Sequence, residues 1–134
     1  MLPVHDATIR LFLHVLAATV WVGGQLTLAG LVPVVRRLGP DATREVARRF
    51  DRIAWPAFAV LVATGVWNLL EVDIGDTDIE YQVTVGVKLV LVALAGGGAA
   101  VHRAAGSTKV LAVAAAVGAA ASLGALFLGV LLRT

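Results

Sequence analysis

The chain has 134 residues, of which 59% are hydrophobic and only 15% charged, and its formal net charge is +2. The mean hydropathy of +0.89 is too high for a typical soluble domain, in which apolar residues make up about half. The basic residues collect beside apolar runs, a pattern of membrane topology that argues against nucleic-acid binding. The absence of cysteine excludes disulfides and thiolate metal sites. We therefore predict an integral membrane protein in contact with the lipid bilayer.

Four apolar segments follow one another along the chain. Their approximate ranges are 10–35, 53–70, 83–102 and 110–132. The first has no charged residue from Leu11 to Val35, and these 25 residues exceed the length needed to cross a hydrocarbon core of about 30 Å as a helix. The pattern predicts an all-α protein, with residues 1–134 forming one domain that is an integral membrane four-helix bundle.

The connection after the first segment is rich in arginine. It carries six arginines against three acids between Arg36 and Arg52. After the break at Pro40, we expect Asp41 to act as an N-cap. Apolar residues at helical spacing, from Val46 to Ile53, predict a short amphipathic helix that lies at the membrane surface before it leads into the second span.

The other connections set the expected orientation. The second connection contains only acidic charges, at Glu71, Asp73, Asp76, Asp78 and Glu80, whereas the third is basic. Lys and Arg are retained on the cytoplasmic side of a membrane, while acids count for little. Both basic connections should therefore be cytoplasmic. The N- and C-termini and the acidic connection should then lie outside, in a multi-pass protein of the bacterial inner membrane.

The fourth segment has small residues at helical spacing. Ala114, Gly118 and Ser122 recur every four residues, and such stripes allow helices to approach closely in lipid. We interpret this span as a packing helix. Its small face also predicts a homo-oligomer formed through span four.

Two basic side chains lie inside the apolar segments at a similar depth. His14 is about three residues inside its segment and Lys88 about five, roughly 5–8 Å below the outer boundary by helical rise. A lysine in hydrocarbon costs at least about 2.5–3.5 kcal/mol unless it is paired, hydrated or near an end. Lys88 is thus either functional or snorkels to the headgroups. For His14 the alternatives are a hydrogen bond to a neighbouring helix, a metal or haem ligand, or a proton carrier.

Other polar residues are expected near these two. His14, Ala18, Trp21 and Gln25 share one stripe of the first span, which should face the bundle interior. Asn68, in the second span, falls near the same depth as His14. His102 lies fourteen residues after Lys88, roughly 21 Å along a helix, so it would belong only to a second, cytoplasmic-side site.

Several short motifs resemble those of a known family. They are H-x6-W-x-GG in span one, R-F-x-R-x-A and L-x-x-TG around span two, and K-L-x-L-V in span three. The matching residues are His14, Trp21, Gly23, Gly24, Arg49, Phe50, Thr64, Gly65, Lys88 and Leu89. Together they resemble the copper-resistance D superfamily of bacterial membrane proteins and the related four-helix membrane protoporphyrinogen oxidases. In the oxidase branch a span-one histidine and a span-three lysine form the functional pair and haem b is bound, which by resemblance implies His14 and Lys88.

The first functional hypothesis is therefore a haem-b protein with a redox or haem-related role. His14 would be the axial ligand and Lys88 the second ligand or the partner of a propionate, with Trp21 and Asn68 around them. The alternative is copper binding or transport, in which the acidic connection collects Cu(II) and His14 and His5 receive it. A third reading is a structural membrane subunit without a ligand. The sequence leaves open whether the protein is an enzyme and which substrate or redox partner it uses.

Overall fold

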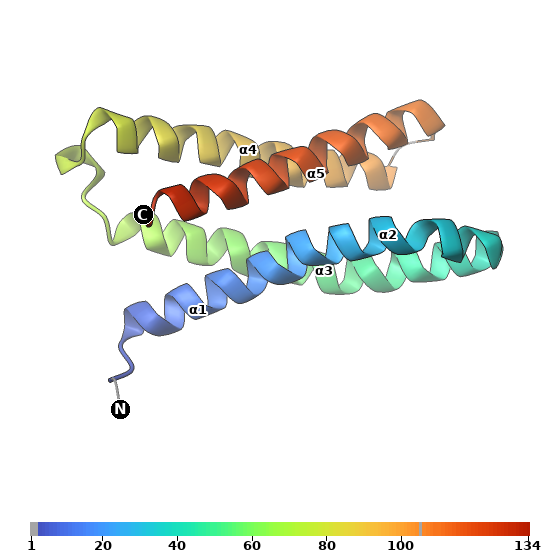
Figure 1. The fold of residues 1–134 in the computed structure, drawn as a ribbon, viewed down its shortest axis with the longest axis horizontal. Coiled ribbons are helices and arrows are strands. Elements are labelled where there is room, and N and C mark those ends of the chain that lie inside the picture. The colour runs from blue at the N-terminus through green and yellow to red at the C-terminus, as the bar shows by residue number, and fades with distance from the viewer. Residues whose placement is uncertain (1–2, 105) are drawn as a thin grey trace. The chain divides into compact units, whose positions relative to one another are not determined.

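The computed structural model describes residues 3–104 and 106–134, which form a series of long helices (Figure 1). The elements in order are α1 (Asp6–Ala18), the π-helical segment η1 (Thr19–Gly23), α2 (Gly24–Arg37), α3 (Pro40–Leu70), the 3-10 turn η2 (Ile74–Asp76), α4 (Ile79–Ala104) and α5 (Thr108–Leu131). The described residues contain no strand. Taken together, α1, η1 and α2 form one helical stretch, and this stretch, α3, α4 and α5 are each long and apolar enough to cross a membrane. The predicted all-α membrane class is confirmed.

The helices form two compact units, the first ending at Asp73 and the second beginning at Ile74. In the first unit the blue-to-cyan ribbon of α1, η1 and α2 runs alongside the green ribbon of α3 (Figure 1). In the second unit α4 packs on α5. The prediction that the whole chain forms a single domain stays a prediction.

The first span is interrupted by a π-helical turn. Residues Thr19–Gly23 adopt this turn between two α-helices. Such turns are rare in proteins overall, but many of those that occur are found at functional sites. Two side chains bond to backbone carbonyls around it: the Thr19 hydroxyl donates to the Val15 carbonyl at 2.9 Å, and the Gln25 amide donates to the Trp21 carbonyl at 3.1 Å. The Gln25 side chain thus bonds to the backbone of its own helix. The prediction of a polar stripe that faces the bundle interior did not include this bond.

The second span is longer than predicted. Helix α3 runs without a break for 31 residues, roughly 46 Å, so the stretch before Ile53 is the first part of the second long helix and the prediction of a short surface helix there is wrong. Its N-cap is Gly39, with a φ of 108°, and Pro40 occupies the first turn, so Asp41 is not the N-cap. Glu45 then accepts hydrogen bonds from Arg48 and Arg49 at 2.6 and 3.0 Å. These pairs, three and four residues apart, stabilise the helix in the stretch that precedes Ile53.

The second unit is built on small residues. The buried residues of α5 are Ala114, Gly118, Ala121, Ser122 and Ala125. A Cβ added at Gly98 of α4 would lie 2.9 Å from the Ala114 carbonyl oxygen and 2.9 Å from the Gly118 Cα. The small face of α5 therefore packs against α4 of the same chain. A homo-oligomer through span four stays a prediction, and it would need another face of this helix.

Candidate functional site

The His14 side chain of α1 is held by α3. Its Nδ1 lies 2.9 Å from Thr64 Oγ1, and that hydroxyl lies 2.6 Å from the Val60 carbonyl oxygen. A carbonyl can only accept, so the single hydroxyl proton of Thr64 goes to Val60, and Thr64 accepts from His14. Nδ1 of His14 therefore carries the proton. In this tautomer Nε2 has the lone pair, which is the form in which a histidine binds a metal.

Gly65, next to this threonine, leaves space for the imidazole of His14. A Cβ at Gly65 would lie 3.4 Å from His14 Cε1, so the ring rests against the α3 backbone. Thr64 itself is only 5% exposed. The Thr-Gly pair thus has two physical roles, because the hydroxyl orients the ring and the glycine makes room for it.

A charged cluster lies where the start of α1 meets the end of α3, one helical turn from His14. An Arg10 Nη atom is 3.3 Å from Glu71 Oε1, and Trp67 donates its indole N–H to the same oxygen at 3.1 Å. The Arg10 guanidinium carbon also lies 5.8 Å from the centre of the Trp67 ring. Sequence reasoning missed this cluster. The available signal was the four-residue spacing between Arg10 and His14, which places both on one face of α1.

Trp21 lies in a different environment from His14. It is 3% exposed, and its ring centre is 4.4 Å from that of Phe58 and 5.8 Å from that of Trp55. Phe58 precedes Thr64 by six residues, or roughly 9 Å along α3. Trp21 is therefore part of an aromatic cluster beside the π-helical turn, and Trp55 belongs to that cluster as well.

Asn68 and Lys88 belong to different units. Asn68 is half-buried on α3, one turn beyond Thr64. The half-buried Lys88 of α4 has its Nζ 3.1 Å from the position that a Cβ would take at Gly129 of α5. Gly129 is in the last turn of α5, where the carbonyl end of the helix dipole favours a cation. The second unit thus accommodates Lys88 by itself, and the shared site of His14 and Lys88 stays a prediction.

Among the residues that the structure describes, the remaining candidate ligands do not form a metal centre. No group of three or more His, Cys, Asp or Glu side chains that could hold a metal exists in the described part of the chain. His5 precedes His14 by nine residues, about 13 Å along a helix, so the two cannot bind the same ion. His102 Nδ1 donates to the Leu111 carbonyl at 2.8 Å and so links the end of α4 to α5.

Comparison with known families gives a match over more than half of the chain. The family described as copper resistance protein D matches residues 44–132, which are 89 of the 134 residues. The matched part includes Thr64, Gly65, Asn68 and Lys88 and begins after His14. Comparisons with curated proteins and with solved structures give no match. The length of the family match and the four apolar helices lead to the same conclusion: the chain belongs to the copper resistance protein D family of membrane proteins.

Proposed function

We propose that this protein handles copper in the bacterial inner membrane and that His14 binds the ion as it passes. The observation that carries the proposal is the 2.9 Å hydrogen bond between His14 Nδ1 and Thr64 Oγ1. This hydrogen bond holds the imidazole ring in one orientation, which supports a lone pair on Nε2 that points in a fixed direction. The family match supports copper as the ion, and Thr64 and Gly65, which hold the imidazole, both lie within the matched residues.

The chemistry of a single oriented imidazole suits a transported ion. Imidazole nitrogen is a good copper ligand, and an outer hydrogen bond such as the one from His14 to Thr64 fixes the ring and raises its basicity. A transported ion must bind strongly enough to enter the site and weakly enough to leave it. One protein ligand with exchangeable water in the other positions meets both needs. A resident copper centre would instead require several fixed ligands.

The same residues fit haem b less well. Of the residues assigned to haem in the first unit, Trp21 lies in the aromatic cluster with Phe58 and Trp55 rather than at the imidazole of His14. The family match also supports the copper alternative rather than haem. We therefore propose copper rather than haem b as the bound group.

The orientation of the protein determines the side from which copper enters. The arginine-rich stretch from Arg36 to Arg52, at the end of α2 and the start of α3, supports a cytoplasmic position for that end, with both termini outside. His14 would then lie near the outer face. A single cysteine at Asp76 should react with an impermeant thiol reagent on intact cells, and one at Thr43 should not. The opposite labelling pattern would place His14 near the cytoplasm.

The ligand is tested on the purified, detergent-solubilised wild-type protein. After growth with added copper and a haem precursor, the protein should bind about one copper per chain in an equilibrium titration. Its visible spectrum should show no Soret band. A Soret band together with no copper uptake would reverse the proposal in favour of haem, and the absence of both would favour a structural subunit.

A further inference from the structure

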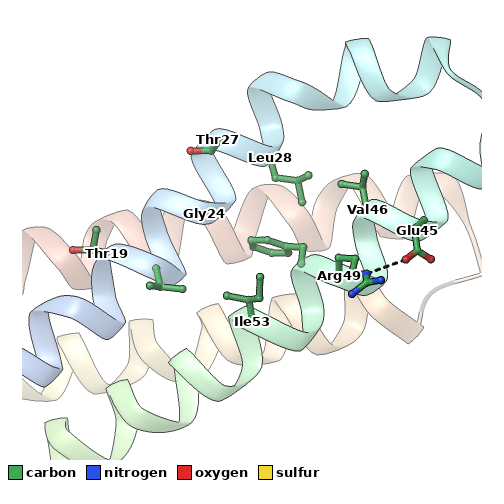
Figure 2. A pocket seen from close by; sticks show the side chains of 10 residues that line it. Thr19, Gly24, Thr27, Leu28, Glu45, Val46, Arg49 and Ile53 are labelled. Carbon is green, nitrogen blue, oxygen red and sulfur yellow. Dashed lines mark hydrogen bonds and ion pairs between the residues drawn. The ribbon is translucent and has the colours of Figure 1, made fainter.

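The first unit has a groove away from His14, between α2 and the first turns of α3 (Figure 2). Its volume is about 810 Å³, within the range of ligand sites. The lining residues are Thr19, Val20, Gly24, Thr27, Leu28, Glu45, Val46, Arg49, Phe50 and Ile53. Most of them are apolar, and the two charged residues both come from the start of α3. The groove is therefore apolar along most of its length and charged at one end.

The apolar length of the groove depends on a close contact. A Cβ at Gly24 would lie only 2.9 Å from Phe50 Cε2, so the Phe50 ring lies directly against the backbone of α2. This contact brings the two helices together at the floor of the groove. Val46 and Ile53 come from the turns of α3 on either side of Phe50, and Ile53 is 62% exposed. The floor is thus a continuous apolar surface that follows the direction of α3.

The charged end is an oriented arginine. Arg49 donates its Nε–H to Glu45 at 3.0 Å, as the dashed line in Figure 2 shows. Its side chain is 71% exposed, and among the described residues its two terminal nitrogens have no partner. Holding Nε fixes the plane of the guanidinium and leaves the paired terminal N–H groups for a ligand. Paired N–H groups in one plane are the geometry that binds two oxygens of a phosphate.

Arg49 lies close to the start of the apolar run of the second span. It lies one turn before Ile53, where the apolar run of the second span begins, and the surrounding stretch from Arg36 to Arg52 has six arginines against three acids. Such basic stretches at the membrane surface attract anionic lipid headgroups. We infer that the groove binds one anionic phospholipid, with its phosphate on Arg49 and an acyl chain along Val46, Phe50 and Ile53. This site is separate from the proposed copper ligand.

The inference is tested by lipid binding to the whole protein in non-ionic detergent. Native mass spectrometry should detect one retained phosphatidylglycerol per chain, and phosphatidylcholine should bind at least tenfold more weakly. Arg49→Gln should weaken phosphatidylglycerol binding about tenfold, the scale expected for loss of a charge-assisted pair of hydrogen bonds. Copper binding should be unchanged in this variant.

The control is Arg44→Gln. Arg44 is similarly exposed, at 65%, and pairs with Asp41 on the same helix, but it does not line the groove. Its loss should change phosphatidylglycerol binding less than twofold. Equal weakening in both variants would show general attraction by the basic stretch and overturn the inference, as would equal binding of the two lipids by the wild type.

Discussion

Replacing Gly98 by alanine is expected to lower the thermal midpoint of the protein in detergent by several degrees. The new Cβ would lie 2.9 Å from both the Ala114 carbonyl oxygen and the Gly118 Cα. Both are backbone atoms, so the clash cannot be relieved by a side-chain rotation and α4 and α5 must separate. Overpacking of this kind costs roughly 1–3 kcal/mol.

The neighbouring glycine provides a matched control. A Cβ at Gly97 meets nothing within 4 Å, and alanine favours a helix over glycine by roughly 0.5–1 kcal/mol. Gly97→Ala should therefore leave the midpoint unchanged or raise it. Equal midpoints for Gly98→Ala and Gly97→Ala would mean that the close contact between α4 and α5 is absent in the protein.

The second large effect is expected at Thr64. Thr64→Val removes the acceptor of the His14 Nδ1–H bond while keeping the shape of a side chain that is 5% exposed. Loss of an outer hydrogen bond to a metal-binding histidine usually weakens metal affinity about 10- to 100-fold. An equilibrium copper titration of the purified variant should show a loss of this size.

Thr64→Ser is the control for this position, because it keeps the hydroxyl and removes a methyl group. Its copper affinity should stay within a few-fold of the wild type. Should Thr64→Val bind copper as well as Thr64→Ser does, the hydrogen bond would not orient a copper ligand, and the proposed role of the Thr-Gly pair would be wrong.

The sequence predicted the helices well because membrane spans have a strong compositional signal. Length and hydropathy were enough to identify the four apolar helices. They were not enough to place the start of α3. A polar stretch between spans is typical of a surface helix, but Gly39 and Pro40 start the helix early and the pairs of Glu45 with Arg48 and Arg49 continue it.

The site was predictable only in part. A polar stripe containing His14 indicated that the imidazole faces a neighbouring helix, and the structure places it on Thr64. The π-helical turn around Trp21 was not predicted, because the hydrophobic pattern of the first segment is that of an ordinary helix. The pairing of Arg10 with Glu71 joins residues 61 positions apart, which a single sequence does not reveal.

Packing by small residues was expected on α5, and the structure confirms that Gly118 is buried there. The tighter position is Gly98 on α4, within a run of glycines whose spacing alone gives no preferred face. Which of adjacent glycines faces the partner helix follows from the rotation of α4, and that rotation is set by contacts in three dimensions. Gly97 and Gly98 illustrate the point, since one is open and the other is in contact.

The most direct test of the account is pulsed electron paramagnetic resonance of the Cu(II)-loaded protein. If His14 binds copper through Nε2, the spectrum of the wild type should contain the echo modulation that the remote nitrogen of a coordinated imidazole produces. His14→Ala should lose this modulation, whereas His102→Ala should keep it, because the proposal assigns copper to His14 and His102 instead links the end of α4 to α5. Modulation that persists unchanged in His14→Ala, or that is absent from the copper-loaded wild type, would contradict the proposal.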